Sequence, residues 1–283
     1  MAERYDVVVI GAGPAGYVAA IRCAQLGLNT ACVDQWLSRA GKPVLGGTCL
    51  NAGCIPSKAL LESSERYAET RDALAAHGIK VAGVELDLHA MMARKDKVVE
   101  ELTEGIAQLF KSNRVSWIQG HAQLHANREV RISESATNSE RTLQAGYVIL
   151  APGSSAVQLD SAPLHEDIVV DSTGALEFSE VPQRLGVIGA GVIGLELGSV
   201  WRRLGSQTVT LLEAQECFLP IADEMVAREA LRVFSGQGLN IQLGSRVMSS
   251  EVSDGVVRIR YQNAEGDHEA EFDKLIVAVG PLT

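Results

Sequence analysis

Two cysteines in a short glycine-rich stretch have the residue type and spacing for redox chemistry. Cys49 and Cys54 lie five positions apart in GGTCLNAGCIPSK, residues 46–58. A regular α-helix would hold Cα atoms at this spacing about 8 to 9 Å apart, whereas a disulfide needs about 4.4 to 6.8 Å. A disulfide between them therefore requires the segment to bend, and Gly53 and Pro56 permit a bend.

The surroundings of the two thiols favour redox chemistry over metal binding. Pro56 is a favoured first-turn residue, so a helix is expected to begin near it, and the partial positive charge at a helix start favours the thiolate form. Two thiols seldom hold zinc alone, and no second CxxC or His pair lies nearby, so no metal site is predicted. The other cysteines are interpreted as structural, buried thiols: Cys23, Cys32 and Cys217.

A dinucleotide-binding motif begins the chain. A predicted strand over residues 5–10 runs into GAGPAG, a helix from about Ala15 to Leu26 follows, and a second short strand ends at Asp34. In this order of elements, the acid is placed to bind ribose hydroxyls. The three glycines serve the tight turn, the approach of a pyrophosphate and the packing of helix on strand, in the order Gly11, Gly13 and Gly16.

The same motif recurs in the second half of the chain. A strand over 185–188 precedes a helix that runs to Leu204 and stops at Gly205, and Glu213 closes the next strand. An acid there binds a ribose 2′-hydroxyl and repels a 2′-phosphate, so the motif favours NAD over NADP, and no nearby arginine replaces it. The glycines of this second motif are Gly189, Gly191 and Gly194.

Two such motifs predict an α/β fold with two Rossmann-like dinucleotide-binding domains. Glycines that serve packing alone would not require the two acids, and two dinucleotides in one chain indicate electron transfer between them. The domains are expected at 1–151 and 152–283, the second starting with a crossover over 152–182. Further helices are expected over 57–78, 86–115 and 223–239, the last ending at Gly236 or Gly238. Strands are expected over 115–133, 141–153 and 275–280, and a loop tip over 133–140.

Composition narrows the class of protein. The chain has 25 basic and 35 acidic residues and a formal charge of −10, which disfavours nucleic acid as a partner. The first apolar run is too short and too broken by glycines for a signal or membrane segment. We therefore expect a cytoplasmic protein with no membrane partner.

The motifs carry a family resemblance over essentially the whole chain. GGTCLNAGCIPSK, with GAGPAG before it and VIGAGVIGLELGSVW after it, resembles the flavin-dependent disulfide reductases, and among them the dihydrolipoamide dehydrogenases. The resemblance implies FAD at the first glycine motif and Asp34, and NAD at the second glycine motif and Glu213. It adds five cofactor-binding residues: Gly47, Thr48, Lys58, Gly153 and Gly280.

The resemblance also implies a mechanism. Cys49 would exchange with a lipoyl dithiol, Cys54 would pass electrons to the flavin ring, and hydride would then pass to NAD+. Lys58 would lie near the flavin and pair with Glu196; the competing interpretation makes Lys58 a solvated helix residue and Glu196 a surface residue. The implied partners are the lipoyl domains of 2-oxo acid dehydrogenase complexes, and family members are homodimers.

Some features leave alternatives open. Ser57 and Glu213 argue against glutathione reductase, but mercuric reductase shares the Ser-Lys pair, and a nucleotide-binding module that reduces only dyes is a third possibility. The family has Ala-Thr-Gly where this chain has Ala-Pro-Gly at 151–153, and it has an arginine where this chain has Pro281 after Gly280. Chains of the family also continue into an interface domain with a His-Glu acid/base pair. We therefore expect a C-terminally incomplete chain with weak or absent lipoamide turnover and a doubtful dimer, and no catalytic base is assigned.

Overall fold

The computed structural model describes residues 3–134 and 139–282. Contacts within the chain divide it into two compact units, the first made of residues 3–56 and 96–154 and the second of residues 57–95 and 155–282. The chain finally passes to the second unit at Ser155, close to the predicted boundary, but 57–95 also groups with the second unit. The division into an FAD domain and an NAD domain stays a prediction.

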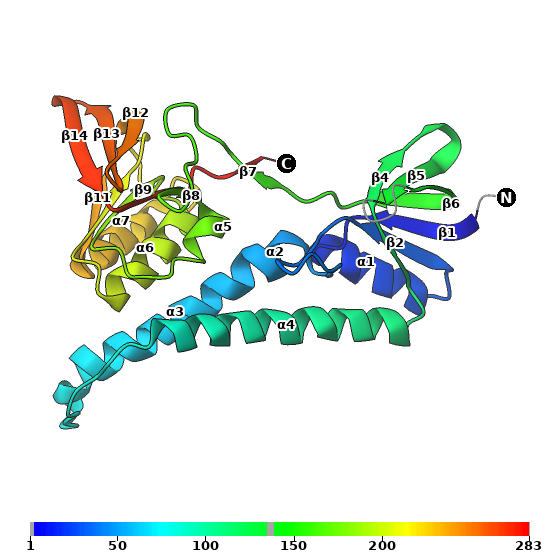
Figure 1. Ribbon diagram of the computed structural model, residues 1–283, viewed down its shortest axis with the longest axis horizontal. Helices are drawn as coiled ribbons and strands as arrows, with labels where there is room; N and C mark the ends of the chain where they lie inside the picture. Colours follow the sequence, from blue (N-terminus) through cyan, green and yellow to red (C-terminus); the bar gives the residue numbers. More distant parts are fainter. Residues whose placement is uncertain (1–2, 135–138, 283) are drawn as a thin grey trace. The chain divides into compact units, whose positions relative to one another are not determined.

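The first unit contains a six-stranded sheet in the order β3-β2-β1-β6-β5-β4. The first four strands in this order are parallel, β5 pairs with β6 antiparallel, and β4 pairs with β5 antiparallel. In β1, Val7 and Val9 face a core shared with α1 and α4, while Val8 enters a core on the opposite face, which explains the continuous apolar run. The elements, marked in Figure 1, are β1 (Glu3–Ile10), α1 (Pro14–Gln25), β2 (Thr30–Asp34), β3 (Ser116–Gln119), β4 (His121–Leu124), β5 (Glu129–Glu134) and β6 (Ser139–Leu150).

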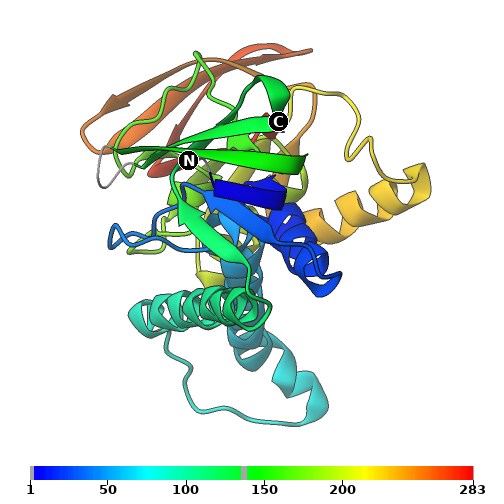
Figure 2. The same cartoon turned by 90° about the vertical axis from the view of Figure 1, so that its right-hand side faces the viewer.

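Helices occupy the chain between β2 and β3. The predicted helices are present, and the expected helix start near Pro56 is confirmed, because α3 begins at Cys54 and has Pro56 in its first turn. Cys49 lies in a separate short helix that was not predicted. A π-helical turn and a 3-10 turn follow α3 in the connection to α4, which is coloured cyan in Figure 2. These elements are α2 (Gly47–Ala52), α3 (Cys54–Ala68), η1 (Glu69–Ala73), η2 (Leu74–His77) and α4 (Leu88–Ser112).

The second unit repeats the parallel arrangement. Its five-stranded sheet has the order β11-β10-β9-β15-β8, with every pair parallel. The predicted crossover over 152–182 contains β8, whose three residues were too few for a periodic signal. The elements are β7 (Ser155–Ala156), β8 (Val169–Asp171), α5 (Ser172–Ala175), β9 (Arg184–Ile188), α6 (Val192–Leu204), β10 (Thr208–Leu212), α7 (Glu224–Gly236), β11 (Leu239–Gln242), β15 (Lys274–Val277) and β16 (Pro281–Leu282).

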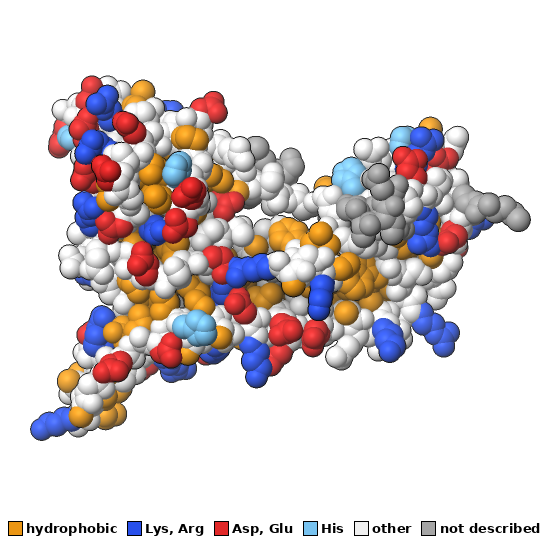
Figure 3. Space-filling view, viewed as in Figure 1, with side chains coloured by type: hydrophobic (Ala, Val, Ile, Leu, Met, Phe, Trp, Pro, Cys, Tyr) orange, Lys and Arg blue, Asp and Glu red, His pale blue; other side chains and the backbone are white. Residues whose placement is uncertain are grey.

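An antiparallel three-stranded sheet, β12 (Arg246–Ser253), β13 (Val256–Asn263) and β14 (Gly266–Phe272), completes the second unit. Alternate residues of β13 enter the core, and those between them are exposed. On the exposed face Arg258 pairs with Glu271, and Arg260 pairs with Glu269 at 2.8 Å. Side chains of both charges accordingly gather at the upper left of Figure 3. This sheet covers one face of the parallel sheet through a shared apolar core.

The predicted helix ends agree with the structure where a glycine stops the helix. α6 ends at Leu204 and Gly205 follows with φ 124°, and α7 ends at Gly236, one of the two predicted stops. The predicted loop tip over 133–140 is narrower, because β5 and β6 extend into it, and its residues 135–138 lie outside the described residues. Within the described ranges, no helix is long and apolar enough to cross a membrane.

Candidate functional site

The first glycine turn depends on close backbone contacts. Gly11 has φ +97°, and a Cβ atom there would lie 2.0 Å from the carbonyl oxygen of Ala151. A Cβ atom on Gly16 would lie 1.8 Å from the carbonyl oxygen of Gly11, so α1 packs against the turn. On Gly13 it would meet only the Cα atom of Gly47, at 3.9 Å. Gly11 and Gly16 therefore have the turn and packing roles predicted for them, while the approach of a pyrophosphate at Gly13 stays a prediction.

Asp34 connects this turn to the end of β2. One carboxylate oxygen accepts the N–H of Ala12 at 2.5 Å, and the other accepts the N–H of Trp36 at 2.7 Å. A carboxylate has about four lone-pair positions, so both oxygens can accept further hydrogen bonds from ribose hydroxyls. Asp34 thus holds the middle residue of Gly-Ala-Gly in place and retains capacity for a ligand.

The second glycine turn has the same construction. Gly189 has φ +100°, and a Cβ atom there would lie 2.5 Å from the carbonyl oxygen of Ala278. A Cβ atom on Gly194 would lie 2.1 Å from the carbonyl oxygen of Gly189. At Gly191, no heavy atom of the described chain lies within 4 Å of the Cβ position. The surface of this turn is open where a pyrophosphate is predicted to approach.

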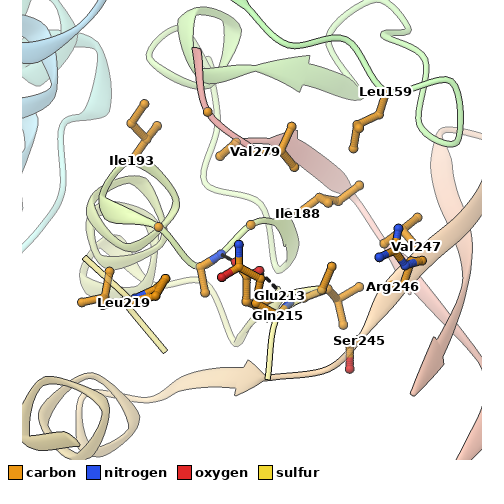
Figure 4. A pocket seen from close by; sticks show the side chains of 18 of the residues that line it. Leu159, Ile188, Ile193, Glu213, Gln215, Leu219, Ser245, Arg246, Val247 and Val279 are labelled. Atoms are coloured by element: carbon orange, nitrogen blue, oxygen red, sulfur yellow. Dashed lines mark hydrogen bonds between the residues drawn. The ribbon is translucent and has the colours of Figure 1, made fainter. Parts of the chain in front are cut away.

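Glu213 plays the part of Asp34 in the second unit. Its carboxylate oxygens accept the N–H of Ala190 at 3.0 Å and the N–H of Gln215 at 2.9 Å. Figure 4 shows Glu213 at the centre of a pocket, with these hydrogen bonds dashed. The pocket has a volume of about 830 Å³ and is bordered by the second glycine turn, the ends of β10 and β15, and the start of β12.

The helices that follow the glycine turns have free N-terminal N–H groups. α1 and α6 are preceded by Gly13 and Gly191, and neither helix has a side-chain cap. Two other helices are capped: Asp171 accepts the N–H of Gly174 at α5, and Asp223 accepts the N–H of Met225 at α7. The uncapped ends offer N–H groups and a partial positive charge to an anion such as a pyrophosphate.

The dithiol segment, residues 46–58, begins in contact with the first glycine turn. Gly46 donates its N–H to the carbonyl oxygen of Ala12 at 3.0 Å. Gly47 has φ +58°, and a Cβ atom there would lie 2.7 Å from the Cα atom of Gly13. Only glycine at position 47 allows this approach, so the start of α2 is fixed against the predicted pyrophosphate turn.

Gly53 breaks the helix between the two cysteines, as predicted. It has φ −141° and ψ −112°, and a Cβ atom there would lie 3.0 Å from the carbonyl oxygen of Thr48 and 3.3 Å from the Cα atom of Cys49. The chain therefore turns tightly between Cys49 in α2 and Cys54 at the start of α3. Both are thiols in this structure, with Cys49 partly buried and Cys54 exposed.

The other cysteines differ in their exposure. Cys32 is fully buried, and burial together with the charge of Asp34 raises the pKa of its thiol; Cys23 is partly buried in α1. For both, the prediction of a structural thiol agrees with the packing. The prediction of a buried thiol was wrong for Cys217, which is exposed and borders the pocket of Glu213.

Lys58 and Glu196 lie together, as the resemblance implied. The Nζ atom of Lys58 is 2.7 and 2.9 Å from the two carboxylate oxygens of Glu196, and the hydroxyl of Ser57 donates to one of them at 2.8 Å. The Lys58 side chain is 57% exposed and that of Glu196 23%. Lys58 is thus ion-paired although it is largely exposed, and the part of the pair in catalysis stays a prediction.

The remaining predicted cofactor residues lie in open positions. Thr48 is exposed on α2. Gly153 and Gly280 have φ +80° and +110°, and no heavy atom of the described chain lies within 4 Å of either Cβ position. One pocket residue was missed by sequence reasoning: Arg246 lies on the pocket wall at the start of β12, far from Glu213 in sequence. Among the described residues, no group of three His, Cys, Asp or Glu could hold a metal ion.

Comparisons with known proteins agree with this arrangement. The family model described as pyridine nucleotide-disulphide oxidoreductase matches residues 5–282. The chain is 46% identical to a dihydrolipoyl dehydrogenase of Cupriavidus necator, over 99% of this chain and 59% of the relative. It is 43% identical to a leghemoglobin reductase of Vigna unguiculata, over 98% of this chain and 52% of the relative. The chain thus spans 52–59% of the length of these curated relatives.

A solved structure gives the same result for the fold. The Cu(II) complex of the HOCl-induced flavoprotein disulfide reductase RclA of Escherichia coli superposes with a TM-score of 0.80 at 26% sequence identity. The match covers 99% of this chain and 57% of that chain. The predicted α/β fold of the glutathione-reductase-like type is therefore confirmed.

Proposed function

Because the chain belongs to the pyridine nucleotide-disulphide oxidoreductase family, whose members use FAD and NAD, we propose that it oxidises dihydrolipoamide to lipoamide and reduces NAD+. The observation that carries the proposal is the contact of Gly47 with Gly13, which joins the dithiol segment to the first glycine turn. A segment with two thiols is thereby fixed to a turn built for a dinucleotide.

The residues of both turns fit the two cofactors. Gly13 and Gly191 lack the side chain that would block a pyrophosphate, and the helices behind them are uncapped. Asp34 and Glu213 hold backbone N–H groups and keep lone pairs for ribose hydroxyls. FAD bound at the first turn would supply the acceptor for two electrons from the dithiol, and NAD+ at the second turn would supply the final acceptor.

The cysteines carry out thiol–disulfide exchange. With Cys49 and Cys54 oxidised to a disulfide, a thiolate of dihydrolipoamide attacks the Cys49 sulfur, and Cys54 leaves as a thiolate. The second substrate thiolate then attacks the substrate sulfur bound to Cys49, which closes the lipoamide ring and releases Cys49. One disulfide is reduced and one is formed, and the protein retains the two electrons on its thiols.

Lys58 places a positive charge one helical turn beyond Cys54 on α3. Three hydrogen bonds hold the Lys58–Glu196 pair in one geometry: two are donated by Lys58 and one by Ser57, and the Glu196 carboxylate accepts all three. We assign the pair the role of holding that charge in a fixed position, where it stabilises negative charge formed on a neighbouring group. The ion pair itself adds little stability, because Lys58 is largely exposed.

The test is to trap the exchange intermediate. In a Cys54→Ser variant, Cys49 has no protein thiol to resolve it, so its attack on oxidised lipoamide should give a mixed disulfide. Rapid acid quenching keeps the second lipoyl thiol protonated and prevents ring closure, so that intact mass spectrometry detects the adduct. The Cys49→Ser variant is the matched control and should gain no such mass at position 54. Both are made in a Cys217→Ser background, because Cys217 is exposed. Attachment at Cys54 alone, or at neither cysteine, contradicts the proposed roles.

We also propose lipoyl domains of 2-oxo acid dehydrogenase complexes as the protein partner and a homodimer as the assembly. The support is the identity to dihydrolipoyl dehydrogenases. The partner is tested by titrating a lipoylated domain against its unlipoylated form and measuring binding, and the assembly is tested by sedimentation. Equal binding of both forms would contradict recognition of the lipoyl group.

Reduction of a different disulfide or of mercuric ion is the second candidate function. The structural likeness to a flavoprotein disulfide reductase that is not described as a lipoamide enzyme favours it. Profiling lipoamide, glutathione disulfide and mercuric ion as oxidants separates the candidates. Reduction of dyes alone, unchanged in Cys49→Ser, would support only a nucleotide-binding module.

A further inference from the structure

The pocket of the second unit contains an uncommitted cation. Among the described residues that border it, Glu213 is the one acidic side chain and Arg246 the one basic side chain. The guanidinium of Arg246 has no hydrogen bond or ion pair within the described chain. On the adjacent strand, by contrast, Arg258 and Arg260 are paired with glutamates. Arg246 therefore keeps its full donor capacity for a ligand anion.

Backbone hydrogen bonds bring the residues just before Arg246 to the end of β10, where Glu213 lies. The N–H of Ser245 donates to the carbonyl oxygen of Glu213 at 2.8 Å, and the N–H of Gly244 donates to that of Gln215 at 2.9 Å. Val247 is buried in the core, so the alternation of β12 directs Arg246 away from the core. Figure 4 shows Ser245, Arg246 and Val247 on the side of the pocket where β12 begins, with Glu213 nearer the centre.

The first unit provides an internal reference for this position. There the N–H of Gly120 donates to the carbonyl oxygen of Asp34 at 2.9 Å, as Ser245 does to Glu213. The residue that follows Gly120 is His121, whereas the residue that follows Ser245 is Arg246. A permanent positive charge at this position is therefore a property of the second turn, and the shared fold does not require it.

We propose that Arg246 determines specificity at the adenosine end of the second pocket, by attracting a phosphate on the ribose 2′-oxygen. This inference rests on the proposed function, because it requires a dinucleotide in this pocket. Glu213 repels a 2′-phosphate, and Arg246, on the adjacent wall, opposes that repulsion with charge-assisted hydrogen bonds. The preference for NAD over NADP is thus set by the difference between repulsion of the 2′-phosphate by Glu213 and its attraction by Arg246. The sequence has no arginine close to Glu213 along the chain, but the fold brings Arg246 into the same pocket.

The test compares ligands that differ by the 2′-phosphate alone. Binding of 5′-AMP and 2′,5′-ADP, and of NAD+ and NADP+, is measured by calorimetry with FAD in excess. The variants are Glu213→Gln, which removes the repulsion, the same change combined with Arg246→Ala, and each single change. Arg228→Ala is the matched control, because it removes another exposed arginine, on α7, that does not border the pocket.

We expect Glu213→Gln to raise affinity for 2′,5′-ADP, and Arg246→Ala to lower it roughly tenfold, the size of one charge-assisted hydrogen bond. Affinity for 5′-AMP and NAD+ should change less than twofold in Arg246→Ala. Added salt should lower the affinity only for the 2′-phosphorylated ligands, and only in chains that contain Arg246. An equal loss for both ligands, or no loss, overturns the role of Arg246 while leaving the pocket a nucleotide site. Failure of 5′-AMP and NAD+ to bind the unmodified chain overturns the proposed NAD site itself.

Discussion

Gly11 and Gly189 begin two turns with the same hydrogen-bond pattern. Each donates its N–H at 2.8 Å to a backbone carbonyl oxygen near the end of the second strand of its motif, that of Val33 for Gly11 and that of Leu212 for Gly189. In each unit an alanine at the end of the neighbouring strand packs its carbonyl against the first glycine, and an acid binds the alanine between the glycines. The shared pattern is a backbone cradle held by hydrogen bonds within the chain.

The two turns differ in what lies against the middle glycine. At Gly13 the backbone of Gly47 is in contact, because the dithiol segment begins there. At Gly191 the corresponding space is open and belongs to a pocket. The first cradle is thus in contact with the segment that holds the two thiols, whereas the second borders an open pocket. A permanent cofactor beside the thiols and an exchangeable one in the open pocket would match this difference.

Substitution of the first glycine should affect both turns alike and most strongly. Alanine at Gly11 or Gly189 puts a Cβ atom 2.0 or 2.5 Å from a carbonyl oxygen, on a backbone with positive φ. We expect each change to lower the free energy of unfolding by about 3 kcal/mol or more, measured by urea denaturation. Gly191→Ala is the control, with φ −75° and open space. Equal losses in Gly11→Ala and Gly191→Ala would contradict the cradle.

Substitution of Gly47 should affect the first turn alone. Its Cβ atom would lie 2.7 Å from the Cα atom of Gly13, with φ +58°. We expect a loss of about 2 kcal/mol in unfolding free energy and release of FAD, measured by visible absorption after gel filtration. Gly153→Ala is the control, because it has the same left-handed backbone with no neighbour within 4 Å in the described chain. If both changes cost the same, the contact with Gly13 contributes nothing.

The glycine turns could be predicted from the sequence because their signals are local. Strand, glycines, helix and acid follow one another within a short span, and helix stops such as Gly205 need no tertiary information. α2 could not be predicted, because six residues are too few for helical periodicity and its start depends on the contact of Gly47 with Gly13. The start of α3 could be predicted near Pro56, because proline favours the first turn of a helix, and the structure has that start at Cys54.

The residues of the candidate site also divide into those that the sequence could predict and those that only the fold reveals. The pairing of Lys58 with Glu196 followed from family motifs, since nothing local connects residues so far apart in sequence. Arg246 was missed because it comes near Glu213 only through the backbone hydrogen bond of Ser245, which forms when β12 begins. Cys217 was interpreted as buried because its residue type usually is, and only the folded pocket wall exposes it.

Amide substitution of the two acids should have a smaller effect that tests whether they hold the turns. In Asp34→Asn or Glu213→Gln, one oxygen can still accept a backbone N–H, but the NH₂ group faces the other donor. Each change should lower the free energy of unfolding by about 1 kcal/mol, and the two losses should add, because the sites share no partner. Glu265→Gln, on an exposed turn, is the control. No loss in either variant would mean that the acids serve the ligand alone.

The smallest expected effect separates the two units by pH. Cys32 lies in β2 beneath the first turn, where burial raises the pKa of its thiol, whereas the second unit has Leu211 at the corresponding place in β10. Unfolding releases the thiol to an ordinary pKa of about 8.5, so above that pH the unfolded state ionises and the folded state does not. Stability from this group is complete below pH 8.5 and is lost as pH rises.

The loss attributable to Cys32 should be about 0.8 kcal/mol at pH 9 while the folded thiol stays protonated. It is measured as the difference between the unmodified chain and Cys32→Val, unfolded in urea with reductant at pH 7 and at pH 9, which cancels the titration of the remaining groups. Leu211→Val is the matched control and should leave the pH dependence unchanged. An identical pH dependence in Cys32→Val would mean that the thiol ionises as easily in the folded chain, and the interior beneath the first turn would then be no drier than its surface.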